Sequence, residues 1–139
     1  MKTYKGLIKN LERNQVLVFG GNTEYRHGKG NALLAVKIAG AKYGKGGAQG
    51  KSYCIITKNL KKKKHPSIDK EFIILQIGEL YDFAKRYWNL EFIVAYSGLG
   101  VNLNGYSNQE MADMFSSFEI PENIIFEENF YKLINIKKC

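Results

Sequence analysis

The sequence predicts an α/β protein in which helices cover both faces of a mostly parallel sheet. Four short apolar runs are typical of buried strands, and apolar residues recur at the helical period in the segments between them. The resulting order is strand, helix, strand, helix, strand, helix, strand, which favours parallel pairing through crossover helices. Two strand–helix junctions, at 20–31 and 98–106, are glycine-rich. Because ligands of open α/β sheets bind beyond the carboxyl ends of strands, the two loops are placed to line one crevice.

The strands are expected at 16–19, 52–57, 90–97 and 124–126. The first consists of Val, Leu, Val and Phe and is expected to stop at Gly20. Segment 40–50, GAKYGKGGAQG, is dense in glycine and is expected to be loop throughout. Residues 1–14 fit a short helix or an edge segment, and the pattern leaves residues 130–139 unassigned.

Three helices follow the first three strands. The first is expected from Ala32 onward, and the second is expected to be capped by Ser67 and to end near Asn89. The apolar stripe of the second helix consists of Ile73, Ile77, Leu80, Ala84 and Tyr87. Ser107 and Glu110 form the Ser-x-x-Glu pattern of a capping box and open the third helix.

Composition favours one folded, soluble domain spanning residues 1–139. Hydrophobic content is 45% and aromatic content 13%, which excludes a disordered chain. Two cysteines and two histidines provide neither a disulfide framework nor a zinc-ligand pattern, so no metal is expected. The first ten residues, MKTYKGLIKN, lack a long apolar core, so we expect no signal peptide, no membrane contact and a cytoplasmic location.

The net charge leaves an electrostatic function open. The formal charge is +8, and part of it lies in the run Lys61–Lys64. Such a run is usually a solvated loop, because arginines and interleaved aromatic residues are missing from it. Non-specific contact with nucleic acid is the alternative.

The first junction has the arrangement that binds phosphate. A strand, a glycine-bearing loop and a helix place unpaired backbone amides and the positive end of a helix dipole at one point. No Gly-Lys-Ser/Thr ends the loop, so it is not a Walker loop, and GKGN lacks the third glycine of the dinucleotide fingerprint. Ordinary turn chemistry is the alternative.

Four segments, VFGGN, HGKGNALLAVKIAGAKYG, SYCIITK and GLGVNLNGYSNQEMADMF, together resemble the macrodomains, a family that binds ADP-ribose. They cover most of the chain from 18 to 115. The pattern is similar to macrodomain-like proteins of phages and bacteria. It is also similar to the branch that contains terminal ADP-ribose–protein glycohydrolase and the antitoxins that remove ADP-ribose from DNA. The resemblance implies a three-layer α/β/α fold with a mostly parallel mixed sheet, a ligand cleft above it and no cofactor.

The resemblance also implies which residues contact the ligand. The first loop would lie against the distal ribose and the diphosphate, and the second would wrap the diphosphate. Tyr106 is a candidate for stacking on adenine or ribose, with packing in the core as the alternative. The implied contact residues of the two loops are Gly21, Asn22, Gly28, Lys29, Gly30, Asn31, Gly98, Leu99, Gly100, Val101 and Asn102.

Catalysis depends on two further positions. In the glycohydrolase branch the lysine of an ITK segment attacks the ribose C1, and the match here is Lys58. A lysine amine attacks only when burial or a cationic neighbour frees its lone pair. Lys58 as the first residue of a solvated loop is the alternative. In that branch an aspartate of the second loop then resolves the lysyl intermediate. Here the corresponding stretch has Asn102 and Asn104 in its place, and an amide cannot act as a general base.

Three functions therefore stay open. The first is binding of ADP-ribose or a related NAD-derived nucleotide, as a reader or a sequestering protein. The second is a glycohydrolase with Lys58 as nucleophile, whose target is an ADP-ribosylated protein or nucleic acid. The third is a basic nucleic-acid-binding protein. The sequence specifies neither the natural ligand nor the oligomeric state.

Overall fold

The computed structural model describes residues 2–22, 30–40, 47–98 and 102–135. Its elements follow in the order β1 (Thr3–Tyr4), β2 (Gln15–Asn22), α1 (Gly30–Ala39), β3 (Gly47–Gln49), β4 (Ser52–Lys58), α2 (Lys70–Arg86), β5 (Glu91–Val94), α3 (Asn108–Phe115), β6 (Ile124–Glu127) and α4 (Glu128–Asn135). The strands form one sheet in the order β1-β6-β5-β2-β4-β3. All neighbours pair in parallel except β3, which runs antiparallel to β4.

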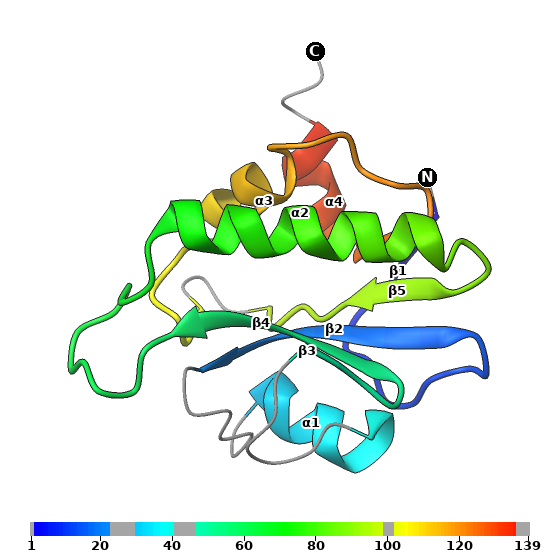
Figure 1. Cartoon of the computed structure of the whole chain (residues 1–139), viewed down its shortest axis with the longest axis horizontal. Helices are drawn as coiled ribbons and strands as arrows, with labels where there is room; N and C mark the ends of the chain where they lie inside the picture. The colour runs from blue at the N-terminus through cyan, green and yellow to red at the C-terminus, as the bar shows by residue number, and fades with distance from the viewer. Residues whose placement is uncertain (1, 23–29, 41–46, 99–101, 136–139) are drawn as a thin grey trace.

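Helices lie on both faces of this sheet, as predicted (Figure 1). Helices α2, α3 and α4 cover one face and α1 covers the other. Strand β2 lies in the middle, and its side chains alternate between the two faces because successive residues of a strand point in opposite directions. Val16 and Val18 belong to the larger core cluster with α2, whereas Leu17 and Phe19 belong to the smaller one with Ala35 of α1. The three-layer α/β/α prediction is confirmed.

Strand β2 is longer than predicted. It continues through Gly20 and Gly21 to Asn22, because β4 pairs with all three residues. The expectation that glycine ends the strand was wrong, since this backbone pairing outweighs the low strand propensity of glycine. Glycine also permits a close approach, because a Cβ at Gly20 would lie 3.0 Å from Thr57 Oγ1.

Helix α2 begins two residues later than predicted, because a helix capped by Ser67 would start at residue 68 and α2 starts at Lys70. Asp69 occupies its N-cap position without a side-chain hydrogen bond, and the helix ends at Arg86 rather than near Asn89. Ser67 does not cap it, because the Ser67 hydroxyl accepts a hydrogen bond from the Asn59 amide. The stripe is buried at Ile73, Ile77, Leu80 and Ala84, but Tyr87 lies beyond the helix and is 41% exposed.

Four further segments refine the prediction. Segment 40–50 is not loop throughout, because residues 47–49 form β3 against β4. Residues 3–4 take the edge alternative as β1, and part of the unassigned tail forms α4. The strand predicted at 90–97 is reduced to β5.

Glu127 and Cys54 are two buried side chains that carry titratable groups. Glu127 is 2% exposed, and its carboxylate accepts hydrogen bonds from the Asn129 and Phe130 amides, which caps α4. Cys54 is 5% exposed, and burial raises the pKa of its thiol to about 12, so it stays a protonated core residue. No helix in the described part of the chain has the length and apolarity to cross a membrane.

Candidate functional site

The carboxyl ends of β2, β4 and β5 meet at one edge of the sheet. Strand β2 lies between the other two, and Asn22 at its end stands opposite Lys58 at the end of β4. Beyond the end of β5, the Ala95 amide donates a hydrogen bond of 2.8 Å to the Val18 carbonyl. The segment that follows β5 therefore still lies beside β2. Helices α1 and α3 begin after β2 and β5, respectively. The carboxyl ends of three strands, β2, β4 and β5, and the N-terminal ends of two helices, α1 and α3, therefore lie at this edge.

The first glycine-rich loop is described at its two ends. Gly21 and Asn22 are buried at the end of β2, with Asn22 7% exposed. Gly30 and Asn31 form the first turn of α1. Gly28 and Lys29 lie outside the described residues. The predicted order of strand and helix is thus confirmed, but α1 begins at Gly30, two residues before the expected Ala32.

The second loop is described on both sides of residues 99–101. Gly98 is exposed and has a φ of 74°, a left-handed conformation that favours glycine. Leu99, Gly100 and Val101 lie outside the described residues. From Asn102 onward the loop leads into α3.

Asn102 holds the second loop together. Its Oδ1 accepts a hydrogen bond of 2.9 Å from Ser97 Oγ, and its Nδ2 donates to the Tyr106 carbonyl at 2.9 Å and to Asn108 Oδ1 at 3.2 Å. The opposite amide orientation would place Oδ1 against the Tyr106 carbonyl, so the network fixes which atom is nitrogen. Both donor hydrogens of the amide are used, one within the loop and one at the first residue of α3.

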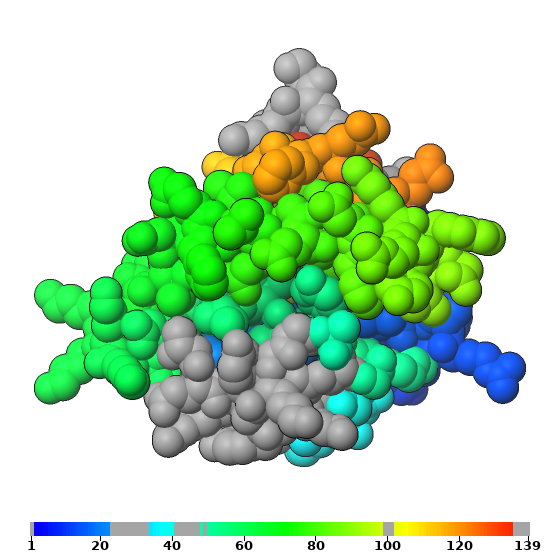
Figure 2. Space-filling view, viewed as in Figure 1, coloured from blue at the N-terminus to red at the C-terminus, as the bar shows by residue number. Residues whose placement is uncertain are grey.

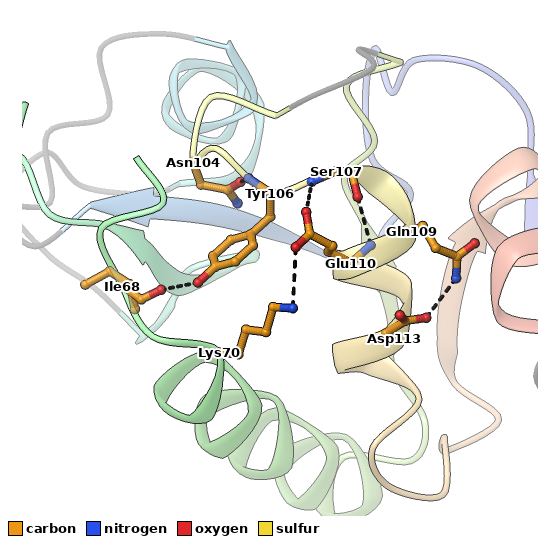
Figure 3. A network of polar contacts seen from close by, with 8 residues as sticks. All are labelled: Ile68, Lys70, Asn104, Tyr106, Ser107, Gln109, Glu110 and Asp113. Carbon is orange, nitrogen blue, oxygen red and sulfur yellow. Dashed lines mark hydrogen bonds and ion pairs between the residues drawn. The ribbon is translucent and has the colours of Figure 1, made fainter. Parts of the chain in front are cut away.

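Tyr106 anchors the same loop in the core (Figure 3). Its side chain is 5% exposed, and its hydroxyl donates to the Ile68 carbonyl, just before α2. Burial, followed by the charge of Asp69, raises the pKa of this hydroxyl, which therefore remains a donor at neutral pH. A ring buried in this way presents no face to adenine or ribose. The structure therefore corrects the stacking role expected for Tyr106 and supports the packing alternative.

The capping box predicted at the start of α3 is present. Ser107 Oγ accepts from the Glu110 amide at 3.1 Å, and Glu110 Oε1 accepts from the Ser107 amide at 3.0 Å. The Ser107 amide is the main cause of a lowered pKa at Glu110. Lys70 at the start of α2 lies 3.4 Å from the Glu110 carboxylate, so the N-terminal ends of α2 and α3 lie near one another (Figure 3).

Lys58 lies at the edge where the strand ends meet. It is the last residue of β4 and is half-buried, so it does not begin the basic loop as a fully solvated residue. The next amide, that of Asn59, donates to Ser67 Oγ at 2.8 Å, and this oxygen lies 2.7 Å from His65 Nδ1. The exit of β4 is thereby tied to the entry of α2.

Gly105 brings the second loop against the segment that follows β4. Its φ is 89°, and a Cβ there would lie 2.5 Å from the His65 carbonyl carbon and the Pro66 nitrogen. Only a residue without a Cβ permits this approach. The sequence marked Gly105 as part of a glycine-rich loop but gave no signal for this contact, nor for the roles of Ser67, Ser97 and Asn108.

No metal site supplements these groups in the described part of the chain, where no three His, Cys, Asp or Glu side chains could hold an ion together. No protein-family model, curated protein or solved structure matches the chain.

Proposed function

We propose that the protein binds ADP-ribose or a related NAD-derived nucleotide over the carboxyl ends of β2, β4 and β5. The observation that supports this proposal is the meeting of three strand ends and the N-terminal ends of α1 and α3 at one edge. Open α/β sheets bind ligands at such an edge, and helix N-terminal amides favour phosphate oxygens. The resemblance of four segments to macrodomains supplies the ligand class.

The described candidates for contact fall at the ends of the two loops. Gly21 and Asn22 end β2, Gly30 and Asn31 begin α1, and Gly98 follows β5. Gly28, Lys29, Leu99, Gly100 and Val101 remain candidates from the sequence. Asn102 and Tyr106 act through the loop, because their polar groups are engaged within the protein.

Binding without turnover fits the composition of the second loop better than hydrolysis. Residues 97–107 contain no aspartate or glutamate, so the loop offers no carboxylate base. The Asn102 amide, which stands in the stretch where the glycohydrolase branch has an aspartate, is occupied by Ser97, Tyr106 and Asn108. We infer that the protein acts as a reader or a sequestering protein.

Replacing Gly98 with glutamate is expected to lower ADP-ribose affinity at least tenfold. A carboxylate within about 4 Å of the diphosphate costs about 1–4 kcal/mol in a partly solvated site, and about 1.4 kcal/mol corresponds to tenfold in affinity. Calorimetric titration with ADP-ribose at moderate salt measures the change.

Gly6→Glu is the matched control for Gly98→Glu. Both glycines are exposed with a φ of 74°, and the nearest atom to a Cβ lies 3.9 Å away at Gly98 and beyond 4 Å at Gly6. The backbone strain and the added charge are therefore alike, and the Gly6 variant should bind ADP-ribose as the wild type does. Wild-type affinity in a folded Gly98 variant would remove the second loop from the site. No binding by the folded wild-type protein would refute the proposed function itself.

Hydrolysis remains a second candidate because Lys58 stands opposite Asn22 at the same edge. If the protein releases ADP-ribose from a modified protein or oligonucleotide, Lys58→Arg is expected to abolish the release and to leave ADP-ribose binding in place. Arginine keeps the positive charge but its guanidinium does not deprotonate to a nucleophile. Single-turnover release, followed by chromatography of free ADP-ribose, measures this. Persistent release would exclude the lysine mechanism.

A further inference from the structure

A basic loop leaves the molecule at the carboxyl end of β4. Residues 59–67, here named the lysine loop, connect β4 to α2 and contain Lys61, Lys62, Lys63 and Lys64, all with exposed side chains. The loop projects beyond the end of β4 at the left of Figure 1. In Figure 2 green side chains at the same place extend from the body of the molecule.

The base of the lysine loop is closed by hydrogen bonds. The Asn59 amide donates to Ser67 Oγ at 2.8 Å, which joins the two ends of the loop. The Lys61 amide donates to Asn59 Oδ1 at 3.0 Å, and the Lys62 amide donates to the Asn59 carbonyl at 3.1 Å. Because these bonds already fix the backbone, less conformational entropy is lost when the loop binds a partner.

The second loop fixes the position of the lysine loop against the sheet. Gly105 packs directly on the His65–Pro66 backbone, because a Cβ added at Gly105 would lie only 2.5 Å from His65 C and Pro66 N. The Tyr106 hydroxyl holds Ile68, the residue after the lysine loop. The four ammonium groups are therefore presented from a defined place beside the edge where the strands end.

The side chains on this loop are suited to a linear polyanion. Its single leucine, Leu60, is half-buried, so the loop offers charge with little apolar surface for insertion into a membrane. Lysine contacts phosphates as a point charge without reading sequence. A nucleic acid also carries condensed counterions, and their release when the lysines bind favours the complex. The separate acidic side chains of a protein carry no such condensed counterions.

We infer that the lysine loop binds the phosphodiester backbone of a nucleic acid. The contact is independent of base sequence and involves about four phosphates, one for each lysine. This inference goes beyond the proposed nucleotide binding and does not rest on it. The lysine loop and the proposed ligand site lie at the same end of β4.

The test uses a single-stranded oligothymidine of about 20 nucleotides and fluorescence anisotropy between about 50 and 200 mM salt, without ADP-ribose. With four phosphates contacted on a single strand, the slope of log affinity against log salt is expected to be about −2.8, which corresponds to about 50-fold over this range. The variant K61Q/K62Q/K63Q/K64Q is expected to lose most of this slope and at least tenfold in affinity at the lower salt.

The matched control is K5Q/K9Q/K37Q/K85Q, which removes four charges from the formal +8, as the first variant does, but at exposed lysines elsewhere. It should keep a slope near that of the wild type. Circular dichroism checks that both variants are folded.

Three results would overturn the inference. The first is no binding of the oligothymidine by the wild-type protein. The second is an equal loss in both quadruple variants, which would indicate general charge attraction. The third is tighter binding to polyglutamate, or to vesicles containing about 30% phosphatidylserine, than to the oligonucleotide. ADP-ribose is absent from these measurements, so their outcome is separate from that of the nucleotide titration.

Discussion

Replacing Gly105 with alanine is expected to lower the free energy of unfolding by about 2–5 kcal/mol and to abolish ADP-ribose binding. A left-handed backbone disfavours a residue with a Cβ, and the φ here is 89°. The Cβ would in addition lie 2.5 Å from two backbone atoms, His65 C and Pro66 N, which no side-chain rotation can move away. The second loop or the segment after β4 must therefore shift. Urea unfolding followed by circular dichroism, together with calorimetric titration, measures both effects.

Gly6→Ala isolates the clash from the backbone strain. Gly6 has a φ of 74°, and a Cβ added there would have no atom within 4 Å, so only the left-handed penalty of about 1–2 kcal/mol is expected. The difference between the two variants measures the contact between the loops. An equal loss in the free energy of unfolding in the two variants would mean that the loops are not held in contact through Gly105.

Replacing Asn102 with aspartate is expected to cost about 2–4 kcal/mol at pH 7 and to create no glycohydrolase activity. The Nδ2 group donates to the Tyr106 carbonyl and to Asn108 Oδ1, and a carboxylate oxygen in its place would face two acceptors. Both bonds are lost and repulsion is added. At acidic pH the introduced carboxyl can be protonated and can donate one of the lost bonds, so the destabilisation is expected to be smaller there.

Asn10→Asp is the control for the added charge, because Asn10 is exposed in the N-terminal segment. Chemical unfolding at pH 4 and pH 7 compares the two variants, and chromatography of free ADP-ribose tests for hydrolysis. An Asn102→Asp protein that releases ADP-ribose from a modified substrate would contradict the binding-only proposal. It would show that the amide alone separates this chain from the glycohydrolases.

The fold was predictable because its signals are local. The apolar run 16–19 and the stripe of α2 each follow from spacing within one element. The capping box of α3 joins Ser107 and Glu110, three residues apart, and was therefore visible in the sequence. Strand β3 was not predictable, since its three residues form a strand only by pairing with β4.

The strand ends beside which the candidate site is proposed were predictable from the sequence, but the contacts around them were not. Glycine-rich loops after two strands indicated the edge at which β2, β4 and β5 end. The hydrogen bonds of the Asn102 side chain form only once the loop has folded. The hydrogen bond from Tyr106 to Ile68 joins residues 38 apart. Ser67 resembled a helix cap, but its hydroxyl binds Asn59, eight residues earlier. Such contacts leave no periodic pattern in the sequence.

The pairing of β1 with β6 has a consequence for how the protein is made. Thr3 pairs with Phe126 and Tyr4 with Glu127, and the Tyr4 hydroxyl donates to the Val94 carbonyl. A ribosome synthesises residues 3–4 long before their partners, and closing so long a loop is entropically slow. Central strand β2 likewise waits for β4 and β5, both of which follow it. We therefore expect β2, β4 and β5 to pair first, and β1 to join the sheet last, after residues 124–127 have left the exit tunnel.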